Sequence, residues 1–129
     1  MLFRSDLDIT DLAYNQQKEI LCSGSKDMKV KVWNFNTKEC LGVLQGHNDI
    51  IKSICFASWK DQIILCSVSN DYYLTLWNLS DKNLTKSIKL PSFASKVLYV
   101  WDKRTLITIH KTGIFSLWNI EKEIGRAHV

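Results

Sequence analysis

Three tryptophans at nearly equal spacing constrain the fold of this chain more than any other feature. Trp33, Trp77 and Trp118 lie 44 and 41 residues apart, and each ends an alternating apolar segment and precedes an asparagine. Self-similarity at this period indicates a repeat architecture, in which each unit buries its apolar faces against its neighbours. We therefore expect a core between units, and a surface for binding other molecules rather than a pocket for chemistry.

The segments around each tryptophan alternate with the period of two that is typical of strands, as Val30 and Val32 do between Lys29 and Lys31. Overlaying the repeats predicts strands at residues 9–14, 19–25, 28–33 and 39–44, then 51–56, 62–69, 72–77 and 84–90, then 94–100, 105–109 and 114–118. No helical period is present. The predicted fold class is all-β, with two four-stranded antiparallel units and a third that lacks its last strand.

Composition agrees with a globular β domain and argues against membrane or nucleic-acid partners. Hydrophobic residues make up 46% of the 129 residues, which is enough to bury a core, and no apolar stretch has the length of a membrane span. The N-terminus lacks a signal-peptide pattern, so we expect the cytosol or the nucleus. The lysines behind the net charge of +4 are scattered, which is typical of a solvated surface and does not predict a nucleic-acid groove.

The four cysteines, Cys22, Cys40, Cys55 and Cys66, contain no C-x-x-C pair. Cys22 and Cys66 are 44 residues apart, so they occupy the same strand position in consecutive units, where a small buried residue is needed. We interpret them as free thiols rather than zinc ligands or disulfides. No P-loop, dinucleotide fingerprint or paired-carboxylate motif is present, and we predict no cofactor and no metal.

The second repeat carries a set of residues at fixed offsets: Gly46-His47, an apolar strand at 51–56, Ser67, Asp71 and Trp77-Asn78. This set resembles a WD-repeat (Trp-Asp repeat) unit of a β-propeller, and the resemblance covers residues 5–123. Asn in place of the final Asp is common in that family and can make similar turn hydrogen bonds. The resemblance implies a partial β-propeller with blades at about residues 1–45, 46–90 and 91–123.

The resemblance also implies a buried hydrogen-bond relay in the second blade. In the family, the tryptophan indole donates to a Ser or Thr hydroxyl, which engages the His of the Gly-His turn, and the Asp of a tight turn holds that His. Carried over, the relay consists of Trp77, Ser67, His47 and Asp71. Loss of one member would leave a buried partner unpaired, at a cost of ~1–3 kcal/mol.

The other two repeats depart from this pattern. The first keeps Ser23, Asp27 and Trp33 but has Arg4-Ser5 in place of Gly-His; the third keeps Thr108 and Trp118, but has Thr112 for the Asp and Leu90-Pro91-Ser92 for Gly-His. We expect these two blades to be held mainly by packing. We also expect His110 to be a surface or turn histidine, and its replacement by Ala to have little effect because only His47 has Asp71 and Ser67 to bridge.

Ser67, His47 and Asp71 admit a second interpretation as a nucleophilic triad. A triad needs an exposed hydroxyl beside an oxyanion hole. Ser67 is expected on an inner strand sealed by Trp77, and the sequence has no Gly-x-Ser-x-Gly elbow. We favour the structural relay and predict that the chain is not an enzyme.

In the family, function means binding other proteins or peptides through the loops that enter each blade and the turns between the second and third strands. The corresponding candidates here are Lys26, Asn48, Asp49, Ile50, Asn70 and Lys111. No aromatic cluster in the sequence marks a hot spot. The resemblance favours an interaction scaffold, and the alternative is a regulatory or targeting propeller domain of a larger multidomain enzyme.

The last six residues, 124–129, interrupt the third repeat where a fourth strand should follow. The codons ATC-GGA-AGA-GCA-CAC-GTC would encode these six residues and resemble a widely used sequencing adapter. Our hypothesis is a non-native tail after residue 123. Two blades and most of a third are fewer than the ~4–8 that close a ring. We therefore expect a fragment whose partners include the remaining blades, and which is marginally stable, aggregates or self-assembles when isolated.

Overall fold

Three antiparallel sheets follow one another along the chain in the computed structural model, which describes residues 7–111 and 113–120. The first contains β1 (Ile9–Asn15), β2 (Ile20–Ser25), β3 (Lys29–Asn34) and β4 (Cys40–Gln45); the second β5 (Ile51–Trp59), β6 (Gln62–Ser69), β7 (Tyr73–Asn78) and β8 (Leu84–Lys89); the third β9 (Ala94–Val100), β10 (Thr105–His110) and β11 (Phe115–Trp118). Each is a meander in chain order, so the predicted all-β, partial propeller fold is confirmed.

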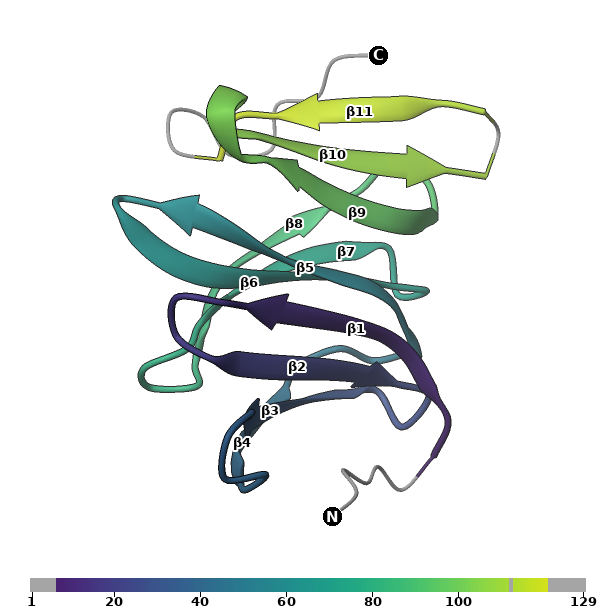
Figure 1. Ribbon diagram of the computed structural model, residues 1–129. Helices are drawn as coiled ribbons and strands as arrows, with labels where there is room; N and C mark the ends of the chain where they lie inside the picture. The colour runs from purple at the N-terminus through teal and green to yellow at the C-terminus, as the bar shows by residue number, and fades with distance from the viewer. Residues whose placement is uncertain (1–6, 112, 121–129) are drawn as a thin grey trace.

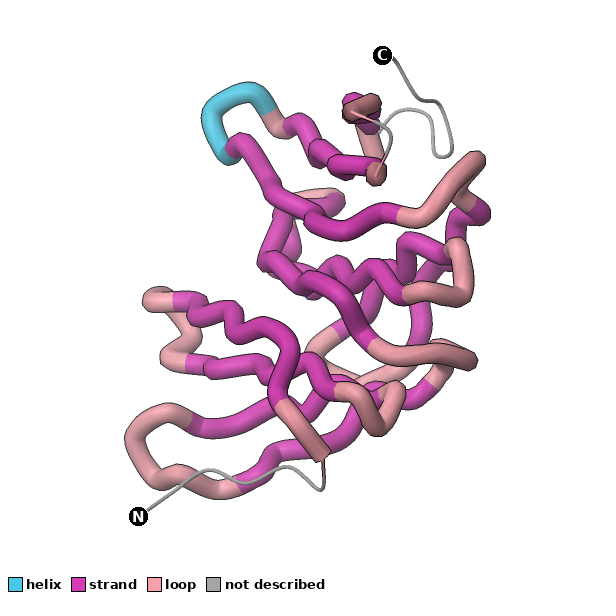
Figure 2. The backbone as a smooth tube through the Cα atoms, turned by 90° about the vertical axis from the view of Figure 1, so that its right-hand side faces the viewer, coloured by secondary structure: helices cyan, strands magenta, loops and turns pink. Residues whose placement is uncertain are grey.

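The sheets stack from the N-terminus to the C-terminus, as Figure 1 shows. The first strand of each sheet lies beside the next one, so that β5 contacts both β1 and β9. In the described part of the chain the single helical segment is the 3-10 turn Trp101–Lys103, drawn in cyan in Figure 2. The residues after 120, where the third blade was predicted to lack its fourth strand, lie outside the described residues.

The core lies between the sheets, as the repeat period predicted. One buried cluster joins Cys22, Val30 and Val32 of the first sheet to Ile51 and Trp77 of the second. A second cluster joins the opposite face of the second sheet to the third sheet. Each sheet therefore uses both faces, because the alternating side chains of a strand point to opposite sides.

Strand boundaries agree with the predicted ones to within a residue or two, except in β5. This strand continues to Trp59 instead of residue 56. Lys60 and Asp61 both adopt positive φ, 51° and 60°, which is the backbone of a two-residue hairpin turn that continues the strand ladder. Nothing in the types of these two residues indicated so tight a turn.

In the first two blades, the asparagine after the repeated tryptophan supports the turn that follows it. Asn34 Oδ1 accepts hydrogen bonds from two backbone amides of the β3–β4 turn, both at 2.9 Å. Asn78 Oδ1 does the same in the β7–β8 turn, at 2.8 and 3.4 Å. The side-chain oxygen of Asn thus provides the turn hydrogen bonds expected at the end of a Trp-Asn pair.

Candidate functional site

The second blade contains a continuous chain of buried hydrogen bonds. Trp77 Nε1 donates to Ser67 Oγ at 2.8 Å, and Ser67 Oγ lies 2.7 Å from His47 Nε2. His47 Nδ1 lies 2.9 Å from Asp71 Oδ2, which also accepts the backbone amide of Asn48 at 2.9 Å. The four side chains of the predicted relay are thereby brought together, and the loop entering β5 is tied to the β6–β7 turn.

Gly46, which precedes His47, lies against the relay tryptophan. A Cβ atom at this position would stand 2.9 Å from Trp77 Cη2, closer than such contacts occur. The turn therefore needs a residue without a side chain, because the indole ring is buried and held by its bond to Ser67.

The first blade has a shorter version of the relay. Trp33 Nε1 donates to Ser23 Oγ at 3.0 Å, and Asp27 Oδ1 accepts the amide of Lys29 at 3.1 Å. The other carboxylate oxygen, Asp27 Oδ2, is buried and finds no partner among the described residues. Arg4 and Ser5, which replace Gly-His in this repeat, lie outside the described residues.

The third blade has a relay of its own, which its departures from the repeat pattern had not led us to expect. Trp118 Nε1 donates to Thr108 Oγ1 at 3.0 Å, and Thr108 Oγ1 lies 3.0 Å from His110 Nε2. His110 Nδ1 lies 3.0 Å from Ser92 Oγ and 3.2 Å from the carbonyl oxygen of Phe93. The histidine comes from the end of β10 instead of from the entering loop.

His110 is therefore not the surface or turn residue that we expected, since only 3% of it is exposed. It stands where Ser25 and Ser69 stand in the other blades, two residues after the relay hydroxyl. Ser69 Oγ donates to the carbonyl oxygen of Asp49 in the loop entering β5 at 3.0 Å, and His110 Nδ1 contacts the carbonyl oxygen of Phe93 in the loop entering β9. The strand period of two could have predicted this position, because residues 108 and 110 share a face of the strand.

A second network, which the sequence reasoning missed, links the blades at their first strands, β1, β5 and β9. Asp11 Oδ2 accepts from Ser53 Oγ at 3.0 Å and from the amide of Ile54 at 2.9 Å. Ser53 Oγ in turn accepts the amide of Val97 at 3.1 Å. Asp11 and Ser53 occupy the same position in consecutive blades, one residue before the partner of the relay serine.

The relay geometry does not suit catalysis. Ser67 is fully buried, and its hydroxyl is engaged by both Trp77 and His47. It therefore offers no accessible nucleophile to a substrate. Within residues 7–111 and 113–120, no group of three or more His, Cys, Asp or Glu side chains is arranged to hold a metal ion.

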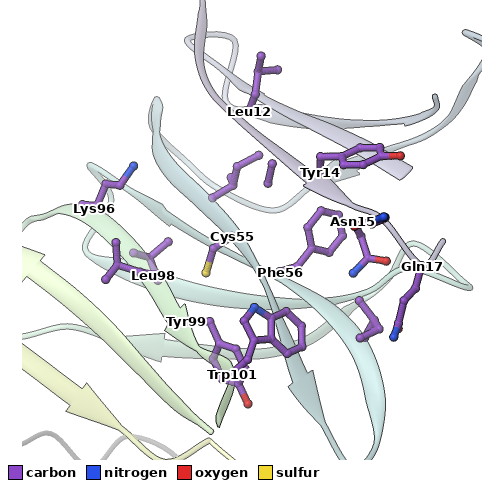
Figure 3. Close-up of a pocket in the computed structure, with 15 residues that line it drawn as sticks. Leu12, Tyr14, Asn15, Gln17, Cys55, Phe56, Lys96, Leu98, Tyr99 and Trp101 are labelled. Atoms are coloured by element: carbon purple, nitrogen blue, oxygen red, sulfur yellow. The ribbon is translucent and has the colours of Figure 1, made fainter. Parts of the chain in front are cut away.

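The first strands of the three sheets, β1, β5 and β9, line a groove of ≈ 570 Å³ (Figure 3). Its walls combine apolar and aromatic side chains with the polar side chains of Asn15, Gln17 and Lys96. Tyr14 of β1, Phe56 of β5 and Tyr99 of β9 contribute to its wall, together with Trp101 of the 3-10 turn. Trp101 is 48% exposed and its ring meets Tyr99 edge-on at 4.8 Å. The groove carries no cluster of acid and base groups.

The loop candidates for partner binding lie at one end of the three sheets, on the right-hand edge of Figure 1. Lys26, Asn48, Asp49 and Lys111 are exposed, while Ile50 and Asn70 are half-buried. The amide of Asn70 donates to the carbonyl oxygen of Ile50 at 3.2 Å, so the loop before β5 and the β6–β7 turn form one surface. Lys26 pairs with Asp8 at 3.4 Å.

An aromatic pair lies at the same end and was not expected from the sequence. The rings of Tyr72 and Phe93 stack with centroids 4.2 Å apart, and Lys111 Nζ lies 5.8 Å from the centre of the Phe93 ring. Tyr72 is 39% exposed. We call Tyr72, Phe93 and Lys111 the aromatic patch. It joins the second blade to the third, and residues 72, 93 and 111 are too far apart in the chain for a sequence pattern to have grouped them.

Comparison with known proteins agrees with this geometry. The family model described as "WD domain, G-beta repeat" matches residues 3–34 and 38–78. Coatomer subunit beta'-2 of Arabidopsis thaliana is 41% identical over 39 residues, 30% of this chain and 4% of that protein. Polycomb protein esc of Drosophila melanogaster is 35% identical over 60 residues, 43% of this chain and 14% of that protein.

A further relative is myosin heavy chain kinase C of Dictyostelium discoideum, which is 44% identical over 39 residues, 30% of this chain and 5% of that protein. The chain thus spans between 4% and 14% of the length of these curated relatives. In the part of the chain that the structure describes, no helix has the length and apolar character needed to cross a membrane.

Proposed function

Because the chain belongs to the WD-repeat family, we propose that it is a non-catalytic scaffold module that binds proteins or peptides. The binding surface is the end of the sheets that carries the loop candidates and the aromatic patch, which we call the loop face. Proteins of this family generally mediate protein–protein interactions, and the family is generally non-catalytic. The four cysteines are free thiols, which is typical of a reducing compartment, and we place the protein in the cytosol or the nucleus.

The aromatic patch is the observation that carries this proposal. Exposed tyrosine and phenylalanine rings are enriched at the centres of protein interfaces, because they bury a large apolar area with few rotatable bonds. Polar residues lie at the same end of the sheets as the patch: Asn48 and Asp49 in the loop before β5, with Ile50, then Asn70 in the β6–β7 turn and Lys26 in the β2–β3 turn. Lys111 adds a positive charge beside the rings, which suits a partner segment with an apolar side chain and a carboxylate.

Photo-crosslinking at two matched lysines tests the proposal. A photoreactive amino acid would replace Lys111 in one variant and Lys60 in the other. Lys60 lies at the opposite end of the second sheet, also exposed and with its Nζ over an aromatic ring, that of Trp59, at 5.0 Å. We expect discrete protein adducts from position 111, which Tyr72→Ala weakens, and none of the same mass from position 60. Equal adducts from both positions, insensitive to Tyr72→Ala, would refute the loop face as the binding surface.

The match to myosin heavy chain kinase C supports one alternative. In this second proposal the blades form a regulatory or targeting domain of a larger enzyme, and the loop face binds that enzyme's target or its catalytic part. Sequencing a longer transcript separates the two proposals, because only the second requires a catalytic domain in the same reading frame.

A further inference from the structure

Cys55 and Cys66 lie directly opposite each other on the adjacent antiparallel strands β5 and β6. Directly opposed residues project to the same face of a sheet. Both side chains accordingly pack against the buried cluster between the second and third sheets, Cys66 as a fully buried member and Cys55 as a half-buried neighbour. The two thiols are therefore adjacent.

The spacing of opposed residues is close to what a disulfide requires. Opposed Cα atoms in an antiparallel pair stand ~4.5–5.5 Å apart, within the ~4.4–6.8 Å found across disulfides. Opposed Cβ atoms stand ~4.5–5.5 Å apart, and disulfides need ~3.5–4.5 Å. The strands must approach locally by up to ~1 Å, which strains the bond slightly and makes it easily reduced.

The two thiols differ in access. Cys55 lines the groove, and in Figure 3 its side chain is drawn on the side of the groove that carries Leu98 and Tyr99. Cys66 is fully buried and does not line the groove. Burial, followed by a side-chain hydrogen bond with Cys55, raises the pKa of Cys66. A reagent from solution thus reaches Cys55 first, and Cys66 reacts only with a sulfur already held beside it.

We propose that Cys55 and Cys66 form a reversible disulfide by exchange with a low-molecular-weight disulfide such as oxidised glutathione. The Cys55 thiolate attacks one sulfur of the reagent, forms a mixed disulfide and releases one thiol. Cys66 then loses its proton and attacks the Cys55 sulfur, which expels the second thiol. Two protein thiols are oxidised to one disulfide and one reagent disulfide is reduced to two thiols, so the exchange balances.

The other blades lack such a pair and serve as internal comparisons. Cys22 occupies the position of Cys66 in the first sheet, but Ala13 lies opposite it. Cys40 is exposed on β4, and the residue opposite it is Trp33. The second sheet is thus the one described sheet in which a buried thiol and an accessible thiol face each other.

Peptide mapping of the folded full chain, oxidised with a glutathione redox buffer and quenched in acid, tests the proposal. Cleavage after lysine separates residues 53–60, with Cys55, from residues 61–82, with Cys66. We expect these peptides to be linked in the wild type and separated by added reduced glutathione. Cys66→Ser should lose the link and retain glutathione on Cys55, whereas Cys55→Ser should lose the link and leave Cys66 unmodified. Ala13→Cys should create a second link, to Cys22.

Cys40 provides the internal reference, because it is exposed and has no cysteine opposite. The proposal is overturned if, once Cys40 is fully glutathionylated, wild-type Cys55 and Cys66 both remain free. It is also overturned if Cys55 keeps a stable glutathione adduct in the wild type and no linked peptide forms. Both of these outcomes are measured on the wild-type protein, so they test the proposal even if a serine variant folds poorly.

Discussion

Ser53 Oγ donates a hydrogen bond to the Asp11 carboxylate at 3.0 Å, which joins the first two sheets at their inner strands. The same Ser53 oxygen accepts the amide of Val97 from the third sheet. One hydroxyl therefore connects all three blades. Lys96 occupies the equivalent position in the third blade. Because an ammonium group has only donors, Lys96 cannot accept a hydrogen bond as Asp11 and Ser53 do.

Replacing Asp11 by Ala should destabilise the contact between the first two blades. The Ser53 hydroxyl and the Ile54 amide would lose their shared acceptor, and we expect a loss of ~1–3 kcal/mol in the free energy of unfolding, measured by urea denaturation. The control is Asp8→Ala, which removes an exposed ion pair with Lys26 and should cost ~0–1 kcal/mol. Equal losses for the two variants would contradict the structural role of Asp11.

His110→Ala should destabilise the protein about as much as His47→Ala does. Each histidine joins a relay hydroxyl to a loop, and its removal leaves buried partners unpaired, at a cost of ~1–3 kcal/mol. This reverses the expectation from sequence alone that His110 has little effect. Thermal unfolding midpoints of both variants test this prediction. A midpoint for His110→Ala equal to that of the wild type would contradict it and support the expectation from sequence.

Ser67→Ala should cost more stability than Ser23→Ala. Ser67 Oγ bonds both Trp77 and His47, whereas Ser23 Oγ accepts a hydrogen bond from Trp33. The extra unpaired partner should add ~1 kcal/mol to the loss in unfolding free energy. The two serines occupy the same strand position in consecutive blades, so each variant is the matched control for the other. A larger loss at Ser23 would show that the longer relay adds nothing.

Gly46→Ala should destabilise the second blade, by ~1–3 kcal/mol, because its new methyl group would meet the buried ring of Trp77. Gly42→Ala is the matched control. Its methyl group would stand 3.0 to 3.1 Å from the side-chain carbons of Lys82, a flexible chain that can move aside. Chemical denaturation curves for both variants test this difference. A tolerated alanine at 46 would mean that the turn has room for a side chain.

Several elements were predictable because they depend on local order along the chain. The alternation around Val30 and Val32 places every second side chain on the same face, and the tryptophan spacing repeats that arrangement. Strand order, the buried cysteines at positions 22 and 66 and the turn role of Asn34 all follow from this. The relay residues of the second blade were predicted because their offsets match the WD-repeat unit that the sequence resembles.

The sequence by itself determined the repeat, the strands and the faces that they bury. Only the tertiary structure decided which polar groups meet. It brought Ser92 to His110, Asp11 to Ser53, and Tyr72 to Phe93. The physical reason is that a buried polar group needs some partner of suitable geometry, whatever its place in the chain. Where the Gly-His turn was absent, a histidine two residues along the strand filled that need, and its identity depended on folded distances rather than on sequence offsets.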